Sequence, residues 1–225
     1  VFIGTLAGYY NTYGSDVVFI GEEAGLYNTT GDDLTFIGED SGYNNTTASD
    51  NTFVGSTAGR TNTTGFRNAF FGSEAGYDNR DGHHNVAVGD SAMIDNSTGR
   101  WNTMVGAASG AGSEYATCST FIGSYAGYDN NRSNSQTTNG RAWFNTYVGM
   151  AAGSGNREGS YNTALGYAAD QKTSTSYFPY TVGNGHDSTA GTSNGANYDR
   201  GPKDGQRSKL CRQNYRGHRS FRGRR

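Results

Sequence analysis

The sequence predicts an all-β fold, a β-solenoid (β-helix or β-roll) of about eleven coils with 17 residues each. Three observations predict it: a repeat that keeps its phase, short strand-forming runs bounded by turn residues, and a composition that is poor in helix formers. The chain has 225 residues with 35 Gly, 2 Pro and 33% hydrophobic residues, and its mean hydropathy is −0.75. Such values alone are typical of disorder, but here the apolar residues recur at a fixed step.

An aliphatic residue followed by Gly anchors each copy of the repeat. Eight anchor glycines lie 17 residues apart from Gly4 to Gly123; the step is then 26 to Gly149 and 17 again to Gly166 and Gly183. The 9 extra residues fall within 131–139, in a polar turn where they extend a surface loop without displacing the strands. We therefore expect a solenoid domain over 1–190, followed by a polar linker and basic tail over 191–225.

Each copy reads approximately N-T-x-F-I-G-x-x-A-G-Y-x-N-T-T-G-x. The run before the anchor Gly is typical of a strand, and the Asn, Thr and Gly residues after it are typical of turns. Stacked coils place like residues above one another, which predicts an Asn ladder at the turn and aliphatic and Ala ladders inside. No window is apolar enough for a membrane-spanning helix, and we expect no membrane insertion.

Two apolar columns precede each anchor Gly, and adjacent strand residues point to opposite faces. We assign the moderate-sized aliphatic column to the solenoid core: Ile3, Ile20, Ile37, Val54, Val88, Val105, Ile122, Val148, Leu165 and Val182. The aromatic column then forms an exterior stripe for self-association: Phe2, Phe19, Phe36, Phe53, Phe70 and Phe121. The alternative is a flattened coil that encloses both columns. An exposed stripe of this kind usually marks an interface, here a homotrimer or a fibre.

The runs from Asn51 to Ala58 and from Asn68 to Ala75 resemble the N-S-x-A-I-G-x-x-A repeats of trimeric autotransporter adhesin heads. They are also similar to the N-T-A-x-G repeats of phage and bacterial tail-fibre-like proteins. The resemblance covers residues 1–183. It implies β-roll trimers that are exposed at cell or virion surfaces and serve attachment. The chain lacks coiled-coil stalk heptads, membrane-barrel strands and an intramolecular chaperone domain, so the resemblance implies an extracellular fibrous architecture without a particular anchor.

Charge and cysteines are unevenly distributed. The formal net charge is −2, but residues 1–199 hold 8 basic and 19 acidic residues and residues 200–225 hold 10 basic and one acidic. Three interpretations of the Arg-rich tail are open: a mobile or uncertain segment, a segment that docks on an acidic rod, or a segment that binds nucleic acid. We do not expect nucleic acid to be a partner. Cys118 and Cys211 are either free thiols or a disulfide in an oxidising compartment. Because the chain begins within a copy, at Val1, we expect it to be part of something longer or to stack head to tail.

We expect no catalytic residues, cofactor or metal site. The adjacent His83 and His84 lack a third ligand, and the acidic residues near the anchor Gly fall on solvent positions. N-x-[ST] sequons share one column and would form a glycan row if they are modified. These candidate glycosylation sites are Asn28, Asn45, Asn62 and Asn96.

The function predicted from these patterns is that of a structural, non-enzymatic protein at the extracellular or cell or virion surface. It would self-assemble into a fibre or spike through stacked coils and the Phe stripe, and the partner would be another copy of the chain. The alternative is a module that binds a regular surface, either glycan or ice, through Thr columns such as Thr29-Thr30, Thr46-Thr47 and Thr63-Thr64.

Overall fold

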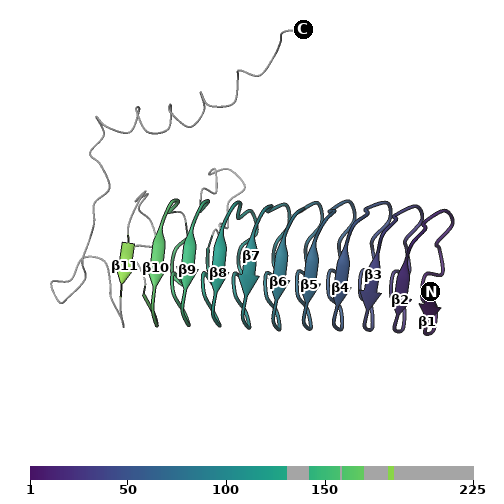
Figure 1. Ribbon diagram of the computed structural model, residues 1–225, viewed down its shortest axis with the longest axis horizontal. Coiled ribbons are helices and arrows are strands. Elements are labelled where there is room, and N and C mark those ends of the chain that lie inside the picture. Colours follow the sequence, from purple (N-terminus) through teal and green to yellow (C-terminus); the bar gives the residue numbers. More distant parts are fainter. Residues whose placement is uncertain (131–141, 158, 170–181, 185–225) are drawn as a thin grey trace, which may run out of the picture.

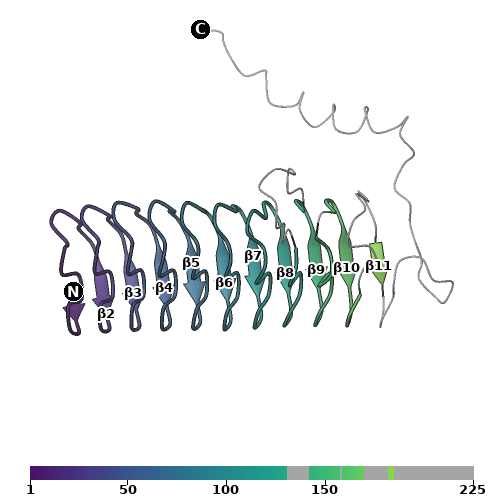
Figure 2. The same ribbon diagram turned by 180° about the vertical axis from the view of Figure 1, so that it is seen from behind.

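The computed structural model describes residues 1–130, 142–157, 159–169 and 182–184. Within these residues it contains eleven short strands and no helix. The strands are β1 (Phe2–Ile3), β2 (Val18–Ile20), β3 (Thr35–Ile37), β4 (Thr52–Val54), β5 (Ala69–Phe71), β6 (Val86–Val88), β7 (Thr103–Val105), β8 (Thr120–Ile122), β9 (Thr146–Val148), β10 (Thr163–Leu165) and β11 (Val182–Asn184). They stack in chain order as one parallel sheet (Figures 1 and 2). The predicted β-solenoid is thus confirmed. It has about nine turns, whereas the sequence predicted eleven coils.

The strands pair in the register that the 17-residue phase predicts. In β3 and β4, for example, Phe36 aligns with Phe53. Phe121 of β8 aligns with Tyr147 of β9 across the 26-residue step, so the insertion leaves the ladder intact. The insertion itself and the basic tail lie outside the described residues.

The last strand departs from the predicted frame. Val182 of β11 aligns with Thr163 rather than with Leu165, because β10 and β11 are separated by a step of 19 residues and not 17. The prediction that Val182 continues the aliphatic column was therefore wrong by two positions.

The anchor glycines are required where one coil lies on the next. Gly38 has a φ of 132°, in a region that disfavours side chains. A Cβ atom at Gly38 would collide with the carbonyl oxygen of Gly55 in the following coil. The same collision recurs at the other anchors whose next coil is described. Glycine at this position lets the backbones of successive coils approach closely.

The phenylalanine column fills the interior of the coil, so its predicted position on the exterior was wrong. Its members are fully buried in the coils that have neighbours on both sides: Phe19, Phe36, Phe53, Phe70 and Phe121. Phe2, in the first coil, is half exposed. The rings stack along the rod with centroids 4.8–5.1 Å apart from Phe19 to Phe70. A self-association stripe made of these residues is excluded because the rings are already packed against one another.

The interior has room for one ring per coil because a glycine lies opposite each ring. A Cβ atom at Gly25, which has a φ of 61°, would lie 2.7 Å from the ring of Phe19. The Ala column is inside as predicted; Ala24, Ala58 and Ala75 are fully buried. Small residues on one wall therefore make space for large rings from the other.

The aliphatic column faces outward, so its assignment to the core was wrong. Its members in β1 to β10 are all half buried or exposed: Ile3, Ile20, Ile37, Val54, Val88, Val105, Ile122, Val148 and Leu165. Strand alternation sends the residue after an inward Phe to the other face. The alternative in which the coil encloses both columns is excluded by the same exposure.

Two columns of buried asparagines line the rest of the interior. In the first, the side-chain Nδ2 of Asn62 donates to Oδ1 of Asn45, 2.8 Å away, and also to the carbonyl of Gly65. In the second, Oδ1 of Asn68 accepts a hydrogen bond from the backbone N–H of Asn85. Both columns satisfy polar backbone groups that the tight turns leave inside the coil.

Candidate functional site

The outward surface of the strands is the most regular surface of the rod. It carries two columns. One is the aliphatic column, with Phe71 in β5. The other is a column of small or β-branched residues two positions earlier: Val18, Thr35, Thr52, Ala69, Val86, Thr103, Thr120, Thr146 and Thr163. We call these two columns together, from β1 to β10, the strand face.

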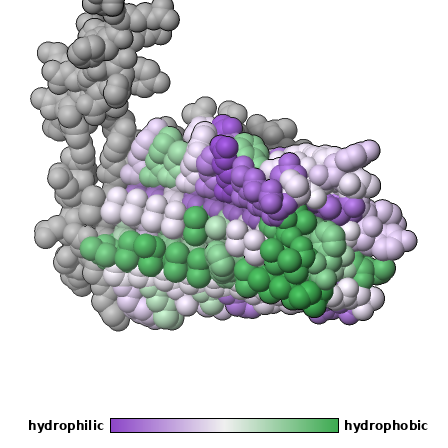
Figure 3. Space-filling model, turned by 45° about the vertical axis from the view of Figure 1, so that its right-hand side comes forward, coloured by the Kyte–Doolittle hydropathy of each residue, from purple (hydrophilic) through white to green (hydrophobic). Residues whose placement is uncertain are grey.

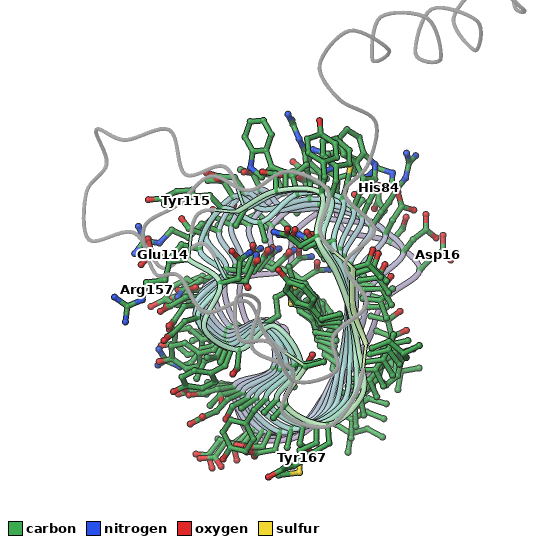
Figure 4. All side chains as sticks on the ribbon, turned by 90° about the vertical axis from the view of Figure 1, so that its left-hand side faces the viewer. Asp16, His84, Glu114, Tyr115, Arg157 and Tyr167 are labelled. Carbon is green, nitrogen blue, oxygen red and sulfur yellow. The ribbon has the colours of Figure 1, made fainter. Side chains whose placement is uncertain are left out.

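The strand face is uncharged along the length of these strands. Figure 3 shows an apolar band that runs along the rod, with paler residues beside it. In Figure 4, which looks along the rod, the strand face is the right-hand wall between the corner marked by Asp16 and His84 and the lower edge marked by Tyr167. An exposed apolar patch of several hundred Å² on a protein surface is often an interaction site.

Charged residues lie at the flanks of the strand face rather than on it. Asp16, Asp33 and Asp50 occupy the corner before the strands, and Glu22 and Glu39 follow the anchor glycines. Contact with the strand face therefore removes water from methyl and hydroxyl groups but from few charges, which keeps the desolvation cost low.

The turn threonines proposed as a binding array also hold successive coils of the rod together. The Oγ1 atoms of Thr29, Thr46 and Thr63 each donate to a backbone carbonyl of the following coil, over 2.9, 3.3 and 3.1 Å. Their neighbours Thr30, Thr47 and Thr64 are exposed. Only the second residue of each Thr-Thr pair therefore presents a side chain mainly to solvent.

The sequon asparagines are inaccessible in the folded rod, which corrects the predicted glycan row. Asn28, Asn45, Asn62 and Asn96 are all fully buried. The amide nitrogen of each donates to the neighbouring coil's asparagine and to a backbone carbonyl. A glycan on any of them would remove these bonds and would have no space inside the coil.

An aromatic and basic cluster occupies one corner in the middle of the rod. The His83 ring stacks on Phe66, with centroids 4.8 Å apart, and its Nδ1 lies 2.9 Å from Nδ1 of His84. Burial lowers the pKa of His83, and the charges of His84 and Arg100 lower it further. His83 is therefore neutral near pH 7, and the pair is held by ring contacts and a shared hydrogen bond.

A column of tyrosines and a shallow groove lie away from the strand face. Tyr10 and Tyr27 stack with centroids 5.2 Å apart and an interplanar angle of 4°. Beside them is an open groove of about 390 Å³, lined by Tyr10, Tyr27, Thr29, Asn44, Thr46 and Thr63. The groove combines an aromatic wall with amide and hydroxyl groups.

An ion pair and the Tyr43 phenol lie near this groove. Hydrogen bonding with Tyr27 raises the pKa of Tyr43, and burial and the carboxylates of Glu23 and Asp40 add to the rise. Nε of Arg60 lies 3.0 Å from Asp40, which raises the pKa of the guanidinium. The Tyr43 phenol therefore stays neutral and Arg60 stays charged at ordinary pH.

The side chains that could ligate a metal or, for Cys, react as a thiol in the described part of the chain are His, Cys, Asp and Glu. The described residues contain no group of three or more of these side chains that could hold a metal ion. Cys118 is half buried and forms no disulfide with a described residue. Cys211 lies outside the described residues, so a disulfide between the two stays a prediction.

Comparisons with known proteins add no family to this description. No protein family, curated protein or solved structure matches the chain. In the described part of the chain, no helix has the length and apolar character needed to cross a membrane.

Sequence reasoning missed both the strand face and the tyrosine groove. A signal for the strand face was present: the column before Phe holds Val or Thr in most copies, and β-branched residues favour an exposed sheet surface. The groove had a weaker signal, the change from Tyr10 and Tyr27 to Asn44 at one repeat position.

Proposed function

We propose that this chain is a structural, non-enzymatic rod that associates laterally with a second copy of itself through the strand face. The observation that carries the proposal is an aliphatic column (with Phe71 in β5) along ten strands with an uncharged column beside it along nine of them. It replaces the Phe stripe as the contact surface, because the phenylalanines are committed to the interior.

The size of the strand face fits pairing over its whole length. At about 4.8 Å per strand the ten strands extend about 45 Å, and two outward columns with their side chains are about 11 Å wide. Each copy can thus bury about 500 Å², and a pair about 1,000 Å², which is near the lower limit for a specific interface. Full overlap is needed to reach that area, so the proposal favours fibres or bundles in which rods lie side by side.

The location and role follow from the resemblance and stay part of the proposal. The repeats resemble those of adhesin heads and tail-fibre-like proteins, which supports a place at the extracellular or cell or virion surface and a role in attachment. The described rod offers a rigid spacer for this role, because every coil is hydrogen-bonded to the next.

A second candidate is binding to a regular solid surface such as ice. Thr35, Thr52, Thr103 and Thr120 point outward in one column of the strand face, beside the aliphatic column. This arrangement presents hydroxyl and methyl groups at the fixed strand spacing of about 4.8 Å. These outward threonines are different residues from the turn threonines that the sequence predicted as a binding array.

The test places charges on the strand face in alternate coils. The variant Ile20→Lys, Val54→Lys, Val88→Lys keeps the aliphatic stems packed on the sheet while the ammonium groups reach water. We expect the wild-type chain to form dimers or larger assemblies in multi-angle light scattering and this variant to be monomeric. Circular dichroism should show the same β spectrum for both.

The matched control is Thr30→Lys, Thr64→Lys, Thr98→Lys, which adds the same charge at exposed turn positions of the same coils. It should assemble like the wild type. A monomeric wild type at high concentration, or assembly of both variants alike, would contradict self-association. Thermal hysteresis in the wild type, lost only in the strand-face variant, would instead establish ice binding.

A further inference from the structure

The tyrosine column ends abruptly in the third coil. Tyr10 and Tyr27 stack nearly parallel, but the equivalent position of the next coil is Asn44. Tyr43, which precedes Asn44, meets Tyr27 edge to face, with an interplanar angle of 79°. No equivalent ring therefore continues the stack beyond Tyr27, and the groove of about 390 Å³ lies at this break.

The polar groups of the groove are those that recognise hydroxyl groups. The side-chain amide of Asn44 makes no hydrogen bond with any described residue, so it can donate and accept at the same time. The hydroxyls of Thr29, Thr46 and Thr63 donate to backbone carbonyls, and their oxygens remain able to accept. An aromatic wall with one amide and several hydroxyl acceptors suits a ligand that has an apolar C–H face and a rim of hydroxyl groups.

The charges around the groove select against anions. Glu23 and Asp40 lie close enough to raise the pKa of Tyr43, and Arg60 is already paired with Asp40. The Arg60 guanidinium also lies over the ring of Tyr43, 4.8 Å from its centroid. No lysine, arginine or histidine lines the groove. Within the groove, sulfated, carboxylated or phosphorylated ligands would therefore lose water without meeting a cationic lining residue. Arg80, which follows Thr63 in the same column, lies one coil beyond the lining.

We propose that the groove at Tyr27 and Asn44 binds a neutral glycan, with a sugar ring packed against Tyr27 and its hydroxyl groups bound by Asn44 and the column of turn threonines. The site is independent of the strand face. Glu114 and Arg157 continue the column of Thr29, Thr46 and Thr63, and Figure 4 shows them on the side of the rod opposite the strand face. A rod that self-associates through one face can therefore present this groove on another.

The test titrates the full chain with neutral hexasaccharides of glucose, mannose, xylose and N-acetylglucosamine, and with hexagalacturonate as the anionic probe, by isothermal titration calorimetry. At least one neutral glycan should bind. Tyr27→Ala and Asn44→Ala should each weaken that binding by about tenfold, because each removes one major contact. Hexagalacturonate should bind more weakly than that neutral glycan.

Asn44→Tyr is the decisive variant, since it extends the stacked tyrosines and fills the groove without opening a cavity. It should abolish glycan binding and leave the β spectrum and the light-scattering mass unchanged. Tyr161→Ala is the matched control; Tyr161 is an exposed ring stacked on Phe144 at another corner, and its loss should not change binding.

Three results would overturn the proposal: no neutral probe binds at millimolar concentration, Asn44→Tyr binds as tightly as the wild type, or the anionic probe binds best. Because glycan binding and assembly have separate readouts, failure of this site leaves the strand-face proposal standing, and the reverse also holds.

Discussion

At the scale of single residues, the asparagine column shows how one substitution leaves a defect inside the rod. From Asn28 to Asn96, each side-chain nitrogen donates to the asparagine of the preceding coil. The next member is Ser113, which is too short to continue the column. Oδ1 of Asn96 and Oγ of Ser113 are consequently buried without a hydrogen-bond partner among the described residues.

We predict that Ser113→Asn stabilises the rod. The new Nδ2 would donate to Oδ1 of Asn96, and an unsatisfied buried polar group costs about 1–3 kcal/mol. The free energy of unfolding, measured by urea titration, should rise by about 1 kcal/mol. Ser113→Ala is the control, since it leaves the Asn96 oxygen unsatisfied and should give less than this gain. A loss of stability in Ser113→Asn would show that the asparagine column cannot be continued at this coil.

At the scale of one coil, two facing positions share one interior space, and different pairs of residues can fill it. Most coils pair an inward Phe with a Gly six residues later, as Phe70 does with Gly76. One coil instead has Ala87 and Met93, and both are fully buried. Met93 occupies the glycine position with a φ of 59°. A side chain is tolerated there because the ring it would meet is absent.

We predict strong coupling between these two positions. Ala87→Phe alone should destabilise the rod by about 1–3 kcal/mol, because the new ring meets the Met93 side chain. Met93→Gly alone should cost about 2–5 kcal/mol through the cavity it leaves. The double variant restores the pair found in the other coils and should be close to the wild type. Urea unfolding of all four proteins gives the coupling energy; additive single effects would contradict the shared space.

At the scale of the whole molecule, the rod behaves as a one-dimensional stack. Each strand contacts only the strands before and after it, so stability is expected to be a sum of coil and neighbour terms. The strand face also grows with the number of coils, and self-association through it should grow with length.

Removing whole coils tests both consequences. Deletion of residues 35–68 takes out two 17-residue steps and joins Leu34 to Ala69 in phase. The shortened chain should keep its β spectrum per residue and assemble more weakly in light scattering. Deletion of the smaller segment 35–60 breaks the phase and should unfold the flanking coils, although fewer residues are lost. Equal damage from both deletions would argue against a modular stack.

The sequence by itself determined the β-solenoid, the 17-residue register and the place of the insertion, because repeat phase alone decides which residues stack. It also predicted buried Ala and turn Asn columns. It did not decide which way the strands face. Ile20 and Phe19 are both apolar, so alternation alone allows either side chain to point into the coil. The residues on the facing wall of the coil decide between them. Only the tertiary structure decided this, by placing Gly25 where a ring needs space. That orientation turned the phenylalanines inward and exposed the aliphatic column, and the turns buried the sequons, so the candidate surfaces depended on packing across the coil rather than on the repeat itself.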